Sequence, residues 1–297
     1  MRKFQIFSSF WIKIFALLFM TLDHVGLLLM MYHPYEQAYL DLASVFRTIG
    51  RLAMPLFVFM IVEGAIHTKN MKRYLLRLGI MAALISSALA VMAYVPTLSR
   101  YSSIANFGNI FLDLLLAAFT IWLLKQDNKW LKLLILLPLA LATISFVTKG
   151  INYEAQYNVF WYPSFLYLQY DIISLLLAIG FYFAYKGAEV YINFMDVRGY
   201  AKEVWSEGYK RLLVSMLQLL VVATVGVFHY LFVYMWPKAV YWDAKVQLAS
   251  IVSGAIILLY NGKRGYNAKW FQYGAYLYYP LHILVAFGIF VLINGGF

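Results

Sequence analysis

The sequence predicts an all-α protein, built as a polytopic bundle of transmembrane helices. Of its 297 residues, 64% are hydrophobic and 12% are charged, whereas soluble domains carry roughly 25% charged residues. The mean hydropathy is +0.73, and apolar runs of the roughly 17 to 25 residues that span a hydrocarbon core recur along the whole chain. We therefore expect one multi-pass domain over residues 1–297 in the cytoplasmic membrane, with the lipid bilayer as a partner.

Nine apolar segments predict the spanning helices. The first follows Met1-Arg2-Lys3 in the manner of a secretory signal, but it runs to Met31 without a small-residue cleavage site. An uncleaved first helix is therefore favoured. The nine expected helices cover 9–31, 48–67, 72–95, 104–124, 130–148, 164–185, 210–235, 244–260 and 269–293.

Basic residues predict the orientation of the bundle. With the N-terminus inside, 18 of the 24 Lys and Arg residues fall in inner segments and 6 in outer ones. Cytoplasmic connections carry the excess of Lys and Arg in membrane proteins. We therefore expect the N-terminus inside and, because nine is odd, the C-terminus outside.

One inner connection, residues 187–208, mixes apolar and charged residues. Two structures fit this pattern. The segment is either a helix lying in the membrane interface or a charged continuation of the preceding helix followed by a loop.

Composition disfavours two classes of function. The chain has no cysteine, so neither a disulfide nor the Cys/His pattern of a zinc site is possible, and we expect no metal. The net charge of +11 fits membrane topology and contact with anionic lipid, so we expect no nucleic-acid partner. The candidate functional side chains are therefore histidines and carboxylates.

Asp23 and His24 lie inside the first apolar run. An ionisable residue at membrane depth is costly unless it has a partner or a task. The two side chains differ by about 100° around a regular helix, so they do not bond each other. We expect Asp23 to pair with Arg47 or Arg51, which share one helix face. His24 is then either a general base for an amine or hydroxyl or a buried imidazole satisfied by a backbone carbonyl.

Further polar residues are expected at the same depth, in the outer half of the bundle. Taken singly, Arg47 could snorkel to the interface and Asp171 could sit among headgroups. Taken together, the polar residues predict one chamber built by five helices. Besides Asp23, His24 and the two arginines, its expected members are Asn109, Asp113, Asp171 and His282.

A second polar group is expected near the inner face. Basic residues there fit topology and contact with lipid phosphate. A turn flanked by glycines can also bring amides and cations round a phosphate, as a coenzyme A headgroup needs. Glu63 lies about 160° round a straight helix from Arg47, so a kink at Pro55 is needed if both face one chamber. The members of this group are Glu63, His67, Lys69, Arg73 and Arg77, with Asn261, Lys263 and Arg264 in the turn before the last helix.

Five motifs, in order, resemble the TraX family of membrane proteins, and they cover most of the chain outside about 125–245. The motifs are Leu22-Asp23-His24-Val25-Gly26, then Gly50-Arg51-Leu52-Ala53-Met54-Pro55-Leu56-Phe57 continuing to Val62-Glu63-Gly64-Ala65-Ile66-His67-Thr68, then Tyr74-Leu75-Leu76-Arg77-Leu78, then Leu259-Tyr260-Asn261-Gly262-Lys263-Arg264-Gly265, and Tyr278-Tyr279-Pro280-Leu281-His282.

The resemblance implies a membrane acyltransferase. The founding member of the family is associated with N-terminal acetylation of a conjugative pilin, and the family is similar to the acyltransferase-3 group, whose fold is implied here too. In that group a histidine of the first helix is regarded as catalytic, which maps to His24. Asp113 stands where relatives carry Thr, so its role is not inherited, and no role is carried over to Asp171.

The implied reaction moves an acyl group, acetyl or another, from cytoplasmic acyl-CoA to an amine or hydroxyl at or across the outer side. His24 is expected to act as the base, with Arg47, Arg51 or Asn109 stabilising the oxyanion. The inner polar group is expected to bind the donor. The acceptor, whether protein, glycan or lipid, stays open.

A proton-coupled transporter or flippase is the alternative function. Intramembrane Asp, Glu and His residues could form its proton relay. Inverted repeats are typical of many transporters, and the sequence shows none, so the enzyme is favoured.

Overall fold

A computed structural model describes residues 4–95, 108–155, 161–197, 207–235 and 244–294. Within these ranges the chain is helical and forms no β-strand, apart from an isolated bridge between Phe7 and Tyr260. The all-α prediction is confirmed.

Seven helical stretches of the described chain are long and apolar enough to cross a membrane, and two shorter apolar helices accompany them. Each of the nine predicted segments coincides with one of these nine stretches, so the chain is a multi-pass membrane protein. Nine crossings stay a prediction. The helices are α1 (Ser9–Tyr32), α2 (Gln37–Gly50), α3 (Ala53–His67), α4 (Met71–Tyr94), α6 (Ile110–Leu124), α7 (Lys129–Leu133), α8 (Leu136–Ala155), η3 (Ser164–Leu166), α9 (Asp171–Val197), α11 (Glu207–Met235), α12 (Ala244–Leu248), η4 (Ala249–Ile251), α13 (Val252–Leu258) and α14 (Lys269–Asn294).

The second predicted helix, 48–67, begins too late in the sequence, and the chain turns before Pro55, where a kink was considered. Two helices, α2 and α3, cover this region from Gln37 onward, and the chain turns between them at Arg51 and Leu52. Pro55 lies in the first turn of α3, where a missing N–H leaves no helical bond unmade. The change of direction therefore precedes the proline.

The inner connection at 187–208 begins as a continuation of α9, which runs without a break to Val197. The remainder, up to the start of α11 at Glu207, lies outside the described residues. The described half follows the pattern of a charged helix extension.

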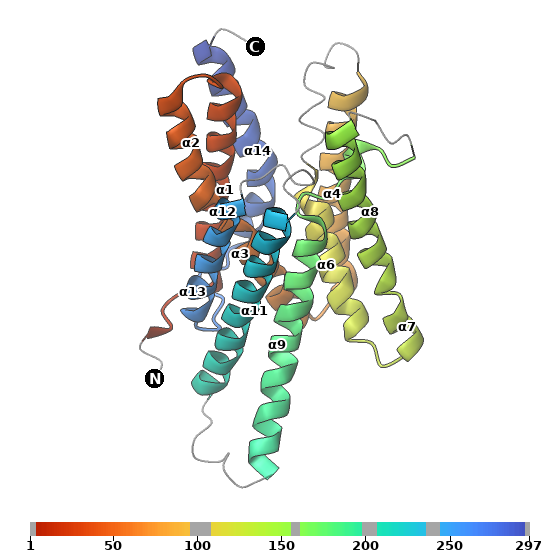
Figure 1. The fold of residues 1–297 in the computed structure, drawn as a ribbon. Coiled ribbons are helices and arrows are strands. Elements are labelled where there is room, and N and C mark those ends of the chain that lie inside the picture. The colour runs from red at the N-terminus through yellow and green to blue at the C-terminus, as the bar shows by residue number, and fades with distance from the viewer. Residues whose placement is uncertain (1–3, 96–107, 156–160, 198–206, 236–243, 295–297) are drawn as a thin grey trace. The chain divides into compact units, whose positions relative to one another are not determined.

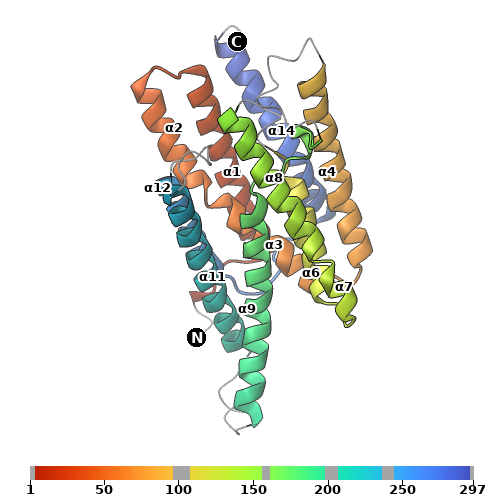
Figure 2. The same cartoon turned by 45° about the vertical axis from the view of Figure 1, so that its right-hand side comes forward.

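The chain packs as two compact units. Unit 1 comprises 1–57, 184–231 and 242–297, and unit 2 comprises 58–183 and 232–241. In unit 1, α1 packs against both α2 and α14, and α12 lies against α2 (Figures 1 and 2). In unit 2, α6 packs against α4 and α8, and η3 packs against α4.

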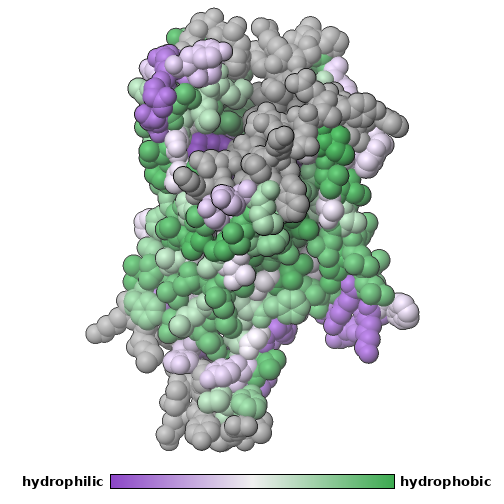
Figure 3. Space-filling model, in the orientation of Figure 1, coloured by the Kyte–Doolittle hydropathy of each residue, from purple (hydrophilic) through white to green (hydrophobic). Residues whose placement is uncertain are grey.

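Lipid-facing positions are evident on the outside of the helices. The face drawn in Figure 3 is largely hydrophobic, and large apolar side chains such as Leu18, Leu84, Leu220 and Leu284 are more than half exposed. In water such exposure would be costly, whereas a hydrocarbon environment accepts it. Asp23, Arg47, Arg51, Asn109, Asp113, Asp171 and His282 are instead buried within the units.

Two glycines let α1 and α2 approach each other closely. A Cβ at Gly50 would lie 2.6 Å from Asp23 Oδ1 and 2.7 Å from Asp23 Cα, and one at Gly26 would lie 3.0 Å from the Ala43 carbonyl oxygen. Small residues permit such backbone contact between membrane helices.

Gly50→Ala is therefore expected to destabilise the protein, by about 1–3 kcal/mol, because the added methyl collides with the backbone and carboxylate of Asp23. Thermal unfolding in detergent measures this as a lower Tm. Gly79→Ala is the matched control, since nothing lies within 4 Å of its Cβ position. An unchanged Tm for Gly50→Ala would show that the two helices separate readily.

Candidate functional site

Asp23 joins α1 to α2 through two arginines. Arg47 Nη1 donates to Asp23 Oδ2 at 3.1 Å, and Arg51 Nη2 donates to Asp23 Oδ1 at 2.7 Å. All three side chains are less than a tenth exposed. The predicted pairing of Asp23 is confirmed, and it involves both arginines rather than one.

The end of α2 presents the two guanidinium groups together. Arg51 keeps helical backbone geometry, and its N–H bonds the Arg47 carbonyl at 3.2 Å. Residues four apart lie on one helix face, so both side chains reach the same carboxylate. The Arg51 Nε group also donates to the Arg47 carbonyl at 3.3 Å, which fixes the plane of the guanidinium.

His24 contacts α14 instead of Asp23. Its Nδ1 lies 3.1 Å from Nε2 of His282, and the ring centroids are 4.9 Å apart. Tyr279 meets the His24 ring edge to face, with centroids 6.2 Å apart. The sequence expectation that neighbouring Asp23 and His24 act separately agrees with these contacts.

Backbone carbonyls determine the tautomers of the two imidazoles. His24 Nδ1 lies 2.9 Å from the Met20 oxygen, and His282 Nδ1 lies 2.8 Å from the Tyr278 oxygen. A carbonyl oxygen only accepts, so we assign a proton to each Nδ1 of the neutral rings. His282 Nε2 is then an acceptor for the His24 Nδ1 proton. His24 Nε2 is left as the unprotonated nitrogen.

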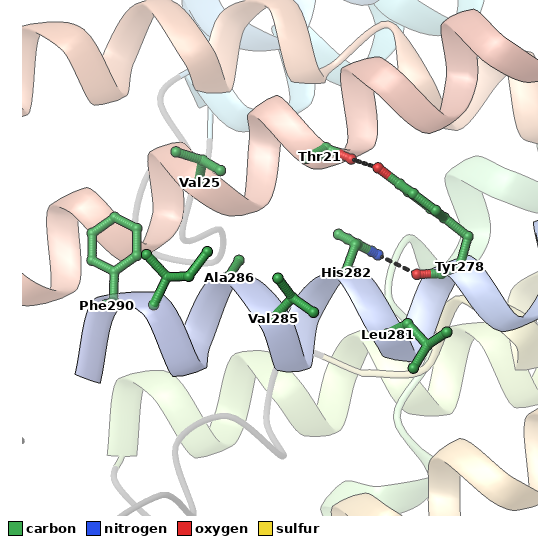
Figure 4. A pocket seen from close by; sticks show the side chains of 9 residues that line it. Thr21, Val25, Tyr278, Leu281, His282, Val285, Ala286 and Phe290 are labelled. Carbon is green, nitrogen blue, oxygen red and sulfur yellow. Dashed lines mark hydrogen bonds between the residues drawn. The ribbon is translucent and has the colours of Figure 1, made fainter. Parts of the chain in front are cut away.

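A cavity of about 530 Å³ lies beside His282, between α1 and α14 (Figure 4). Thr21 Oγ1 and Tyr278 Oη lie 2.7 Å apart at its polar end, and aliphatic and aromatic side chains line the rest. The lining residues are Thr21, Val25, Tyr278, Leu281, His282, Val285, Ala286, Ile289 and Phe290.

The turn before α14 is docked on the start of α1, also in unit 1. The Ser9 and Phe10 N–H groups donate to the Lys263 and Arg264 carbonyls at 2.9 and 3.1 Å. Asn261 Nδ2 donates to the Ile6 carbonyl at 3.3 Å, and Asn261 Oδ1 accepts from the Lys263 N–H at 2.9 Å. Asn261 therefore shapes the turn, while the side chains of Lys263 and Arg264 are exposed.

Asn109, in unit 2, uses its amide to hold helices. Its Oδ1 caps α6 by accepting from the Phe111 N–H at 2.9 Å, and its Nδ2 donates to the Ala82 carbonyl at 2.8 Å and to Ser86 Oγ at 3.0 Å. Both amide hydrogens are thus engaged with α4. The oxyanion role expected for Asn109 is corrected accordingly, because no donor is left for a ligand.

Asp113 and Asp171 organise the start of α9 within unit 2. Asp113 accepts from the Gln169 N–H at 2.6 Å, from the Tyr170 N–H and from Ser174 Oγ at 2.8 Å. Asp171 forms an ion pair with Lys149 and has a positive φ of 50°. These bonds give Asp113 the role of a cap.

The predicted donor-binding residues of unit 2 lie around the end of α3 and the start of α4. His67 Nδ1 bonds the Glu63 carbonyl at 2.9 Å and lies 3.9 Å from the Glu63 carboxylate. Lys69, Arg73 and Arg77 are exposed. Lys125, which sequence reasoning did not select, donates to the Ala65 and Ile66 carbonyls at 3.1 and 3.2 Å and so caps α3.

The candidate residues therefore fall into separate groups. Unit 1 brings together Asp23, His24, Arg47, Arg51 and His282, and it also contains Asn261, Lys263 and Arg264. Unit 2 brings together Asp113 and Asp171, with Asn109, Glu63, His67, Lys69, Arg73 and Arg77 elsewhere in it. One chamber shared by all the predicted outer residues stays a prediction.

Sequence reasoning missed Thr21, Tyr278 and Lys149. Thr21 and Tyr278 stand three and four residues from His24 and His282, which is the helical spacing of one face. That spacing was a usable signal. Lys149 was counted only as a topological charge, and its partner Asp171 is far away in the sequence.

Asp23→Asn is expected to lower the free energy of unfolding by about 3–5 kcal/mol, because it removes the carboxylate that accompanies two buried guanidinium groups. Thermal unfolding of detergent-purified protein measures the loss. Glu36→Gln is the control, since it removes a carboxylate from the exposed pair with His33, and such pairs contribute little. Equal Tm values for the two variants would contradict the structural role of Asp23.

Comparison with known proteins places the chain in a family. A family model described as "TraX protein" matches residues 8–225, well over half of the 297 residues. The chain is also 39% identical over 72 residues to the "Probable fimbrial assembly protein FimC, serogroup H1" of Dichelobacter nodosus, an alignment that covers 24% of this chain and 27% of that protein. The chain thus spans about a quarter of the length of this curated relative. No solved structure matches. With most of its length matched by the family model, the chain belongs to the TraX family.

Proposed function

We propose that this protein is a membrane acyltransferase with His24 as its general base, and that it resides in the cytoplasmic membrane. The observation that carries the proposal is the histidine pair of unit 1. His24 offers an unprotonated Nε2 because its Nδ1 is engaged by the Met20 carbonyl and by His282. A neutral imidazole held this way can take the proton of an amine or hydroxyl during its attack.

The reaction transfers an acyl group from the thioester of acyl-CoA, acetyl-CoA being the simplest donor, to an amine or hydroxyl. His24 Nε2 takes the proton of the acceptor as its nitrogen or oxygen attacks the thioester carbonyl carbon. The tetrahedral oxyanion collapses, the carbon–sulfur bond breaks, and the imidazolium returns the proton to the thiolate. The atoms balance without a covalent enzyme intermediate, a metal or a redox partner.

Charge supports the oxyanion step. Arg47 and Arg51 are buried, and both donate to the carboxylate of Asp23, the residue that precedes His24. Preorganised cations in a site that excludes water stabilise developing negative charge by several kcal/mol. We assign this role to the arginines and not to Asn109.

The cavity beside His282 is assigned to the acyl group. Its Thr21 and Tyr278 end is polar and its remaining wall is apolar, which suits a carbonyl attached to an aliphatic chain. The exposed cations Lys69, Arg73, Arg77, Lys263 and Arg264 are assigned to the coenzyme A end of the donor, where phosphate groups need positive charge.

The acceptor is proposed to be an amino group of a surface-fibre subunit. Two findings support this class: the family to which the chain belongs, and the name of the relative as a fimbrial assembly protein. A hydroxyl of a glycan or a lipid could be acylated by the same base chemistry.

His24→Ala is expected to lower acyl transfer at least a hundredfold, which is what loss of a general base commonly costs. Purified protein in nanodiscs is supplied with acetyl-CoA, and release of free thiol is followed with and without acceptor amine. His33→Ala is the matched control, because it removes a histidine of the outer loop paired with Glu36. Near wild-type turnover in a folded His24→Ala protein would remove His24 from the reaction. Proton-coupled flux in liposomes without thiol release would favour a transporter.

His282→Leu is expected to reduce kcat tenfold or more with little change in KM, because His24 loses the acceptor that orients its Nδ1–H. His282→Gln, whose amide oxygen can accept at a similar position, is expected to recover part of kcat. Steady-state kinetics with acetyl-CoA compare the two variants. Equal activity of both variants would show that hydrogen bonding by His282 does not position His24.

A further inference from the structure

A second buried polar cluster lies in unit 1, on α11. Arg211, Ser215 and Gln218 are four and three residues apart, so they share one face of the helix. Ser215 and Gln218 are both 0% exposed. From the sequence, Arg211 counted only as one of the basic residues that set the orientation, and neither Ser215 nor Gln218 was a candidate.

Neutral groups hold the Arg211 guanidinium in place. Nη1 donates to the Tyr185 hydroxyl, and Nη2 donates to Gln218 Oε1 at 3.0 Å. The guanidinium carbon lies 4.5 Å from the centroid of the Tyr260 ring and 5.5 Å from that of Tyr185. These contacts fix the orientation of the guanidinium, and a guanidinium held in one plane is pre-organised to bind a phosphate.

Two buried hydrogen-bonding groups stand beside this cation with no partner in the described chain. Gln218 Nε2 and Ser215 Oγ make no hydrogen bond there. A buried polar atom left without a partner is unfavourable, and in a membrane-spanning helix such groups often mark functional sites. Because Gln218 binds Arg211 through its oxygen, its unpartnered NH₂ group is held next to the guanidinium.

The glycine turn closes the cluster on another side. Gly262 has a φ of +74°, and a Cβ placed there would lie 3.7 Å from Arg211 Cδ. The exposed Lys263 and Arg264 follow in the same turn. Positive charge therefore continues from the half-buried Arg211 to the exposed Lys263 and Arg264.

We propose that Arg211, Ser215 and Gln218 bind a phosphate group at the inner end of unit 1. The Gln218 amide and the Ser215 hydroxyl supply neutral donors, and Arg211 supplies a charge-assisted one. Arg211 is half-buried, so a phosphate reaches it first and meets the two deeper donors behind it.

Two sources can supply this phosphate. One is the coenzyme A part of the donor, and this assignment rests on the proposed acyltransferase function. The other is the headgroup of an anionic phospholipid, which needs no enzymatic activity. Both present phosphate oxygens to the same donors.

The test measures binding of coenzyme A to protein in neutral detergent and of phosphatidylglycerol to protein in phosphatidylcholine nanodiscs. Arg211→Gln is expected to weaken binding of at least one of these ligands about ten- to hundredfold. Lys210→Gln removes the same charge from the neighbouring exposed position and is expected to change binding less than twofold. Inorganic phosphate should compete with the ligand that binds.

Ser215→Ala separates a ligand site from a structural role. The hydroxyl makes no hydrogen bond in the described chain, so its removal is expected to leave the Tm of the free protein unchanged or higher while weakening binding threefold or more. A lower Tm with unchanged binding would show that Ser215 serves packing or holds a buried water, which overturns the proposal. This variant also keeps the test valid if Arg211→Gln does not fold.

The outcomes distinguish the two proposals. Loss of coenzyme A binding in Arg211→Gln places the donor at this cluster. If only phosphatidylglycerol binding depends on Arg211, the cluster is a lipid site. If Arg211→Gln binds coenzyme A, binds phosphatidylglycerol and transfers acyl groups at wild-type levels, the phosphate site is overturned. The acyltransferase proposal is then unaffected. If the wild-type protein binds either ligand through Arg211 but transfers no acyl group, the phosphate site stands and the acyltransferase proposal fails.

Discussion

The ion pairs of Asp23 with Arg47 and Arg51 are the interaction on which unit 1 depends. They connect α1 to α2 at the point where Gly50 allows the two backbones to touch. Removing two guanidinium groups and a carboxylate from water is unfavourable unless their geometry is good. The helical spacing of the arginines supplies that geometry, so one carboxylate receives both. His24, the next residue, points about 100° away around α1 and meets His282 of α14.

The histidine pair shows how a helix sets the chemistry of its own side chains. Each imidazole bonds the carbonyl four residues earlier, and because a carbonyl only accepts, we assign the proton of each neutral ring to Nδ1. The sequence left two roles open for His24, a base or a ring satisfied by a carbonyl. The structure makes them compatible, because the carbonyl occupies Nδ1 and leaves Nε2.

Buried polarity does not always mark a site. Asn109, Asp113 and Lys125 are polar residues of apolar helices or their ends, as His24 is. Each of these three bonds backbone N–H or C=O groups at the end of a helix. Such groups have no partner inside the helix, and in a bilayer water cannot supply one. Ser215 and Gln218 differ from these caps because their atoms lack a partner in the described chain, which is why a ligand is inferred there.

The all-α membrane fold and the positions of most helical segments could be predicted from the sequence, because hydrophobic runs and helical spacing are local properties. The pairing of Asp23 with arginine could be predicted because a carboxylate inside an apolar run needs a cationic partner. The TraX resemblance was likewise carried by short ordered motifs. The folded structure was needed to show that His282 meets His24, that the Asn109 amide bonds α4, and that Arg211 stands beside Tyr260. Each of these depends on which residues distant in the sequence come into contact, and the energy of a buried polar group is decided by that contact.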